Sequence, residues 1–232
     1  MRGSSSASYH DDLGDDAYLQ RQYPQAEAAY REAVRLEPGN AAYHDDLGDA
    51  LCAQERYAEA EAAYREAVRL DPDDAMYHAD LGDALLNQEK YQEAEAPYRE
   101  AVRLDPDNAS YPDDLGDALA GQDRHAEAEA AYREAIQLDP DDATYWCDLG
   151  DALTRQERYT EAAAAFREAI RLEPGEAPYH AHLGDALYQQ GLNAEAEAAY
   201  REAIRLDPDD VADLGESLAR TVARIKASSL PM

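Results

Sequence analysis

The chain has 232 residues and carries 51 acidic against 21 basic side chains, which gives a formal charge of −30. A field of this sign repels nucleic acid and anionic membrane surfaces, and no apolar run approaches the roughly 20 residues of a membrane span. We therefore expect neither a nucleic acid nor a membrane as a partner.

Residues 1–6 lack the apolar centre of a signal peptide and are expected to form a flexible tail. Beyond them the chain repeats itself. The same Leu-Gly pair returns after every 34 residues, at Leu13-Gly14, Leu47-Gly48, Leu81-Gly82, Leu115-Gly116, Leu149-Gly150 and Leu183-Gly184. A period of this length predicts a solenoid, in which each unit buries its apolar face against its neighbours.

Residues 41–74 represent one unit, and their spacing predicts two helices. Apolar side chains recur on one helical face over 42–54 and again over 58–70. Pro72 then ends the second helix, because proline lacks an N–H group and restricts the residue before it. Asp73 or Asp74 can cap the next helix.

Seven positions of this unit carry the pattern of a known family: Leu47, Gly48, Leu51, Ala60, Tyr64, Ala67 and Pro72. With these residues the chain resembles the tetratricopeptide repeat family, and the match holds in six units over residues 7–210. The resemblance implies an all-α fold, a right-handed superhelical α-solenoid of tandem antiparallel helix pairs. At the fourth position the family expects a large aromatic residue, which only Trp146 supplies. A tyrosine one position earlier in every unit is expected to take over its packing role.

Three irregularities interrupt the pattern. In the first unit Asp16 and Ala17 replace the Ala and Leu of later units, so its first helix should pack less well. Pro97 lies inside a second helix, where it removes a backbone hydrogen bond and predicts a local kink. After residue 210 the period breaks, and residues 211–226 read as an amphipathic capping helix, followed by a flexible tail over 227–232.

Charge follows the repeat as well. In the second helices Glu61 precedes Arg65 by four residues, and the recurrence of this pair indicates solvated ion pairs on an outer face. The first helices carry aspartates without such a balance. By resemblance to the family, the first helices line a concave groove for partner peptides, and this groove should be acidic. The candidate partner-binding residues are the aspartates at its fifth and ninth positions with one cysteine and one tyrosine: Asp11, Asp15, Asp45, Asp49, Asp83, Asp113, Asp117, Asp151, Asp185, Cys147 and Tyr188.

An acidic groove favours a cationic protein or peptide as the partner. Family members that clamp the terminal carboxylate of a peptide place Lys, Asn and Arg in the groove, so this chain should not be that kind of receptor. The high similarity between the units is also typical of a self-assembling structural scaffold, or of a consensus-type engineered repeat protein with no specific ligand. Self-association therefore remains an alternative.

Motifs of catalysis and metal binding are missing from the sequence. It contains no GxSxG, P-loop or HExxH motif, so we expect neither enzymatic activity nor a cofactor. His10, His44 and His78 stand a whole repeat apart, too far to share a metal ion. Cys52 and Cys147 form no CxxC motif, which predicts neither a disulfide nor a zinc site and favours a reducing, cytoplasmic setting. The preference for arginine over lysine, with abundant alanine, points to a GC-rich bacterial gene.

Overall fold

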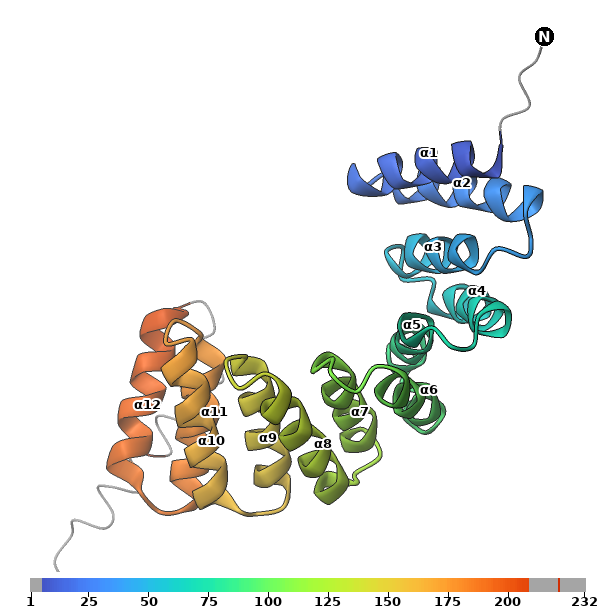
Figure 1. Ribbon diagram of the computed structural model, residues 1–232. Coiled ribbons are helices and arrows are strands. Elements are labelled where there is room, and N and C mark those ends of the chain that lie inside the picture. Colours follow the sequence, from blue (N-terminus) through green and yellow to red (C-terminus); the bar gives the residue numbers. More distant parts are fainter. Residues whose placement is uncertain (1–5, 209–220, 222–232) are drawn as a thin grey trace, which may run out of the picture. The chain divides into compact units, whose positions relative to one another are not determined.

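The computed structural model describes residues 6–208 and residue 221 of the chain. The predicted capping helix over 211–226, apart from Thr221, and the predicted tails, apart from Ser6, lie outside the described residues. The secondary structure that is described is α-helical, without strands (Figure 1). The helices are α1 (Ala7–Leu19), α2 (Tyr23–Leu36), α3 (Ala41–Cys52), α4 (Tyr57–Leu70), α5 (Ala75–Leu86), α6 (Tyr91–Leu104), α7 (Ser110–Ala120), α8 (His125–Leu138), α9 (Ala143–Arg155), α10 (Tyr159–Leu172), α11 (Ala177–Gln189) and α12 (Asn193–Leu206).

The chain divides into two compact parts, Met1–Gln122 and Asp123–Met232, here called the N-terminal part and the C-terminal part. Within each part, the two helices of a repeat pack together as a hairpin, and each hairpin packs on the next. The predicted helices over 42–54 and 58–70 correspond to α3 and α4 to within two residues at each end. The expected all-α fold of tandem antiparallel helix pairs is confirmed. None of the described helices combines the length and apolarity that a membrane crossing requires.

Side-chain caps set the starts of four of the six first helices, α1, α3, α5 and α9. Asn40 accepts a hydrogen bond from the backbone N–H of Ala42 at 3.2 Å, and Asp74 accepts one from Met76 at 2.9 Å. Such caps satisfy N–H groups that have no partner inside the helix. Of the two capping residues that the sequence allowed, Asp74 is the one used.

A left-handed residue ends most of the first helices. After α3, the N–H of Arg56 donates to the carbonyl of Leu51 at 3.0 Å, while Glu55 adopts a φ of 59°. This pattern is a Schellman motif, in which glycine usually holds the left-handed position. Here residues with side chains hold it in five turns, and Gly191 holds it in the sixth; the five are Arg21, Glu55, Glu89, Asp123 and Glu157.

In five of the Leu-Gly pairs, the glycine packs against an aromatic ring of the following helix. A Cβ atom added to Gly82 would lie 2.5 Å from Cε1 of the buried Tyr98, so only glycine leaves room for the ring. The same contact joins Gly14 to Tyr30, Gly48 to Tyr64, Gly150 to Phe166 and Gly184 to Tyr200. The paired helices therefore cross closely at these positions.

The third and fourth positions of the repeat have different roles. The third-position tyrosines of four repeats are buried, which confirms that they replace the usual aromatic residue: Tyr43, Tyr77, Tyr111 and Tyr145. At the fourth position, Nε2 of His44 lies 3.0 Å from the carbonyl oxygen of Pro38, and Nε1 of Trp146 donates to that of Pro140 at 3.0 Å. These side chains tie α3 and α9 to the proline turns before them, and His78 and His180 make the same contact in α5 and α11.

The prediction of solvated ion pairs on the second helices was wrong for their glutamates. Glu61 is only 5% exposed, because the next repeat covers it. It accepts hydrogen bonds from Nε2 of Gln88 at 2.8 Å and from Nζ of Lys90 at 2.7 Å, in addition to its ion pair with Arg65. The glutamate therefore connects two consecutive repeats.

The first repeat and Pro97 were singled out by the sequence. Tyr9 and Leu13 of α1 are 52% and 41% exposed, whereas Leu81, which matches Leu13, is buried. The expected weaker packing does not extend to α2, which α1 contacts as extensively as the paired helices of the other repeats contact each other. Helix α6 contains Pro97 and still has the 14 residues of the other second helices. The proline therefore does not end the helix.

Candidate functional site

A tyrosine of the second helix holds the ninth-position aspartate of the same repeat. The hydroxyl of Tyr64 donates to Oδ1 of Asp49 at 2.7 Å, and that of Tyr98 donates to Asp83 at 2.7 Å. The same bond joins Tyr30 to Asp15 at 2.9 Å and Tyr200 to Asp185 at 2.7 Å. Buried hydroxyl groups need a partner. These aspartates therefore have a structural role as the acceptors of the tyrosine hydroxyl groups.

Aspartates of neighbouring repeats interact directly in the N-terminal part. Asp45 of α3 is 6% exposed, and burial raises its pKa to about 9, with further contributions from the charges of Asp80 and Asp49. Protonated Asp45 donates a hydrogen bond to Asp80 of α5. Asp46 of α3 and Asp11 of α1 form a second such pair, and burial raises the pKa of Asp46 to about 7. Two adjacent carboxyl groups share a proton in this way because both cannot ionise at low cost.

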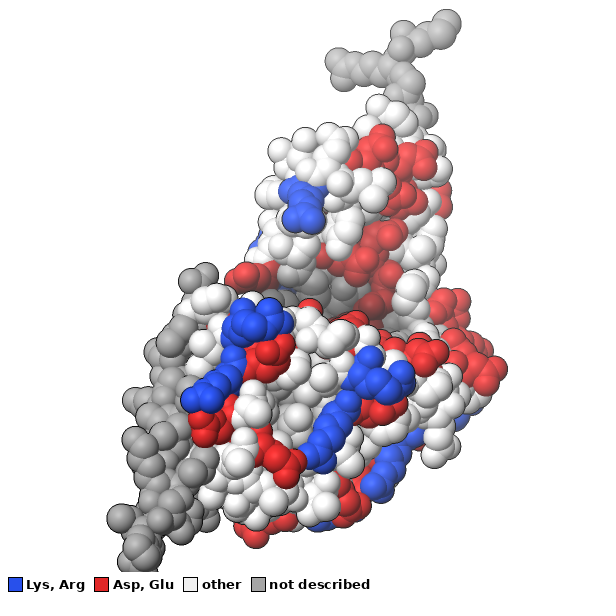
Figure 2. All heavy atoms as spheres, turned by 90° about the vertical axis from the view of Figure 1, so that its left-hand side faces the viewer, with Lys and Arg blue, Asp and Glu red and all other residues white. Residues whose placement is uncertain are grey.

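The first helices of the N-terminal part thus form what we call the acidic face: Asp11, Asp15, Asp45, Asp46, Asp49, Asp80, Asp83, Asp113, Asp114 and Asp117. Burial raises the pKa of both Asp80 and Asp114 to about 7, and the charge of Asp83 adds to both shifts. The second helices differ, since their arginines lie against glutamates, as Arg69 does against Glu66 at 2.6 Å. Figure 2 shows both arrangements: some basic side chains lie next to acidic ones, and elsewhere acidic side chains gather by themselves.

The predicted partner-binding residues differ in exposure. Five are exposed: Asp15, Asp83, Asp117, Asp151 and Asp185. Four are half-buried: Asp11, Asp49, Asp113 and Tyr188. Asp45 and Cys147 are buried, which corrects their placement on an open groove surface; the first helix of the next repeat covers them. Sequence reasoning missed the sixth position, although its signal was present: it is aspartate in the first five repeats and His182 in the sixth.

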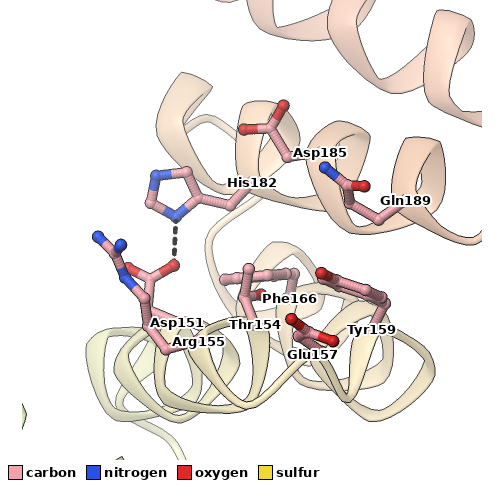
Figure 3. Close-up of a pocket in the computed structure, with 9 residues that line it drawn as sticks. All are labelled: Asp151, Thr154, Arg155, Glu157, Tyr159, Phe166, His182, Asp185 and Gln189. Atoms are coloured by element: carbon pink, nitrogen blue, oxygen red, sulfur yellow. Dashed lines mark ion pairs between the residues drawn. The ribbon is translucent and has the colours of Figure 1, made fainter. Parts of the chain in front are cut away.

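In the C-terminal part, the first helices border a cavity of about 640 Å³, here called the α9–α11 cavity. Its lining residues are Asp151, Thr154, Arg155, Glu157, Tyr159, Phe166, His182, Asp185 and Gln189 (Figure 3). Two of the predicted residues, Asp151 and Asp185, are among them. The ninth position of the repeat, which the family resemblance placed in the groove, therefore borders a cavity here.

One cluster beside this cavity contains a residue that the sequence reasoning did not use. Sγ of Cys147 lies 3.7 Å from Nδ1 of His182, and Oδ1 of Asp151 lies 3.3 Å from the same nitrogen (Figure 3 shows the second contact). The hydrogen bond that the His182 imidazole donates to Asp151 raises the pKa of His182, and burial raises the pKa of the Cys147 thiol. Cys147 was considered alone, because His182 is 35 residues away in the next repeat.

Comparison with known families agrees with this architecture. The pattern described as tetratricopeptide repeat matches residues 12–75, 46–109, 114–177 and 147–211. The chain belongs to the tetratricopeptide repeat family. A comparison with curated protein sequences finds no match.

Solved structures share the fold at low sequence identity. MamA from Desulfovibrio magneticus RS-1 superposes with a TM-score of 0.70 at 23% identity, over 75% of this chain and 98% of that one. YrrB, described as a TPR protein with an unusual peptide-binding site, gives a TM-score of 0.65 at 21% identity, over 87% and 98% of the two chains. A chain of the APC/C hetero-tetramer Cut9-Hcn1 gives 0.73 at 16% identity, and this protein covers 44% of that longer chain. At these identities the likeness shows the fold alone.

Proposed function

We propose that this tetratricopeptide repeat protein is a non-enzymatic protein–protein interaction scaffold, and that its acidic face binds a basic peptide or protein segment. Membership of the family and the likeness to a peptide-binding relative support the scaffold role. The main support for a cationic partner is the crowding of carboxyl groups on the acidic face. There the pKa of Asp45 is raised to about 9 and that of Asp80 to about 7.

A cationic partner relieves this crowding. Lysine or arginine side chains placed near Asp45 and Asp80 stabilise the ionised carboxylates and so lower their pKa values. The carboxyl groups that hold a proton in the free protein then lose it when the partner binds. Binding at pH 7 should therefore release protons, and it should weaken as salt screens the charges.

Calorimetric titration with Arg/Lys-rich peptides tests both consequences. Neutral peptides of the same length are the control, and the titrations are run at low and moderate salt in two buffers of different ionisation enthalpy. We expect tighter binding of the basic peptides at low salt, and a buffer-dependent heat that reports proton release. Binding that ignores salt, or that releases no protons, would refute the acidic face as the site.

A matched pair of double variants locates the site. Asp83→Asn with Asp117→Asn removes two exposed charges from the acidic face, and the asparagine oxygen at position 83 can still accept the hydrogen bond of Tyr98. Asp105→Asn with Asp107→Asn removes the same charge at the exposed turn after α6. At about 0.5–1 kcal/mol for each partly exposed charge, the first pair should weaken binding about 5- to 30-fold. An equal loss with the turn variants would mean that net charge alone attracts the peptide.

Self-association is the second candidate, and one observation favours it. Tyr9 and Leu13 of α1 are exposed at positions where Tyr77 and Leu81 of α5 are buried by packing. An apolar helix face of this kind can bind a second copy of the chain. Light scattering as a function of concentration decides the matter: growth in mass that Leu13→Glu abolishes supports self-association, and a constant monomer mass rules it out.

We also propose a reducing, cytoplasmic setting for the protein. Cys52 and Cys147 are both free thiols. Persistent free thiols are typical of compartments that keep cysteine reduced.

A further inference from the structure

Three departures from the repeat meet at one place in the C-terminal part. Cys147 of α9 stands at the fifth position, where the other repeats have Asp or Ala. His182 of α11 stands at the sixth position, where the other five repeats have Asp, and Phe166 of α10 replaces the tyrosine of the other five repeats. The remaining repeats therefore show what this site looks like without these changes.

The loss of the tyrosine hydroxyl changes what the ninth-position aspartate contacts. Tyr64 donates a hydrogen bond to Asp49, but Phe166 has no hydroxyl to donate to Asp151. The Asp151 carboxylate lies instead 3.3 Å from Nδ1 of His182. The Phe166 ring packs edge-on against the imidazole, with ring centroids 5.4 Å apart, and so limits the orientation of the ring.

Two separations among the three ligand atoms match those of a tetrahedral zinc site. With a zinc–sulfur distance of about 2.3 Å and zinc–nitrogen and zinc–oxygen distances of about 2.0–2.1 Å, a tetrahedral site places sulfur about 3.6 Å and oxygen about 3.4 Å from the nitrogen. The observed separations from Nδ1 of His182 are 3.7 Å for Sγ of Cys147 and 3.3 Å for Oδ1 of Asp151. All three atoms lie within 4.8 Å of one another. Binding a metal ion thus needs little movement.

The same geometry does not suit a cysteine nucleophile. In a Cys–His–Asp relay, the thiol and the carboxylate contact opposite nitrogens of the imidazole. Here both Cys147 and Asp151 approach Nδ1 of His182. Convergence of sulfur, oxygen and nitrogen on one point is the arrangement that a metal ion requires.

We propose that Cys147, Asp151 and His182 bind one Zn²⁺ ion through Sγ, Oδ1 and Nδ1. On binding, the thiol gives its proton to solvent and the thiolate becomes a ligand. The proton on Nδ1 of His182 is likewise lost to solvent, so that the neutral imidazole holds its proton on Nε2 and binds through Nδ1. The ionised carboxylate of Asp151 supplies the third ligand. A sulfur ligand selects zinc over magnesium and calcium, which prefer oxygen. Because Asp151 and His182 also line the α9–α11 cavity, the fourth position is accessible to water or to a side chain of a partner. The site differs from the sequence-based expectation of no metal, which compared histidines only with histidines and cysteines only with cysteines.

Cobalt titration of the full chain, freed of metal by chelation, tests the proposal. We expect one Co²⁺ per chain, with a sulfur-to-cobalt charge-transfer absorption in the near ultraviolet that Zn²⁺ removes by displacement. Cys147→Ser should abolish this absorption, and Cys52→Ser, which changes the other cysteine, should leave it intact. Absence of the absorption from the unchanged protein, or its persistence in Cys147→Ser, would overturn the proposal.

Two further variants replace a residue of the site by the one that the other repeats have at the same position, so they are expected to fold. Phe166→Tyr supplies a hydroxyl that competes for Asp151, and His182→Asp removes the nitrogen ligand; both should keep the helical content seen by circular dichroism. Zn²⁺ affinity, measured by competition with cobalt, should fall about 10- to 100-fold in Phe166→Tyr, as for other changes around a metal ligand. His182→Asp should lower it at least about 10-fold. Unchanged affinity in both folded variants would overturn the proposal as well.

Discussion

Removing the hydroxyl of Tyr64 tests the bond between the two helices of a repeat. Tyr64 is buried and donates to Oδ1 of Asp49 at 2.7 Å, so Tyr64→Phe deletes one hydrogen bond to a carboxylate and leaves the ring packed on Gly48. A hydrogen bond to a charged group contributes about 1.5–3 kcal/mol. We expect Tyr64→Phe to lower the free energy of unfolding by this amount at pH 8, since high pH favours the ionised form of Asp49.

The loss should depend on pH, because the same bond lowers the pKa of Asp49, which burial raises. Without the bond, the pKa of Asp49 rises further, and at pH 5 protonation relieves part of the cost. Urea unfolding followed by circular dichroism at pH 8 and pH 5 measures both values, and hydrogen exchange shows whether the loss is confined to α3 and α4. Tyr9→Phe, at an exposed tyrosine, is the control. Unchanged stability of Tyr64→Phe at pH 8, or an equal loss at both pH values, would refute the reasoning.

Three further predictions concern stability, each measured by urea unfolding. Gly82→Ala should destabilise the protein by about 1–3 kcal/mol, despite the helix propensity of alanine, because the new Cβ meets the Tyr98 ring; an increase in stability would contradict the packing. Glu55→Gly should stabilise it by up to about 1 kcal/mol, because a φ of 59° strains a residue with a side chain; a loss would mean that the Glu55 side chain contributes more than the strain costs. Stability should fall by about 2 kcal/mol between pH 5.5 and 8.5 for each carboxyl group like Asp80, whose folded pKa of about 7 exceeds its ordinary value of 3.8. The sign follows because the folded state binds more protons than the unfolded state in this range, so a stability that rises with pH would contradict it.

The helices could be predicted from the sequence because their signals are local. Pro72 and Asp74 lie next to each other in the chain, and the stop and the cap that they provide involve only neighbouring backbone groups. The recurrence of the Leu-Gly pairs was visible as well, although it did not show that the ring of Tyr98 fills the space beside Gly82.

The solvent exposure of side chains was harder to predict than the positions of the helices. Glu61 and Arg65 form the ion pair that their spacing implies, yet Glu61 is buried by Gln88 and Lys90 of the next repeat. Helical spacing shows which residues share a face of one helix. It does not show whether a neighbouring repeat covers that face.

By itself, the sequence determined the 34-residue period, the two helices of each repeat and the recurrence of aspartate at one position of every first helix. Only the tertiary structure decided that Asp45 shares a proton with Asp80, and that His182 lies against Cys147 and Asp151. The physical reason is the range of the interactions. Helix formation depends on residues within a few positions of each other, whereas proton sharing and metal coordination require atoms of different repeats within a few ångströms, and the packing of neighbouring repeats sets those distances.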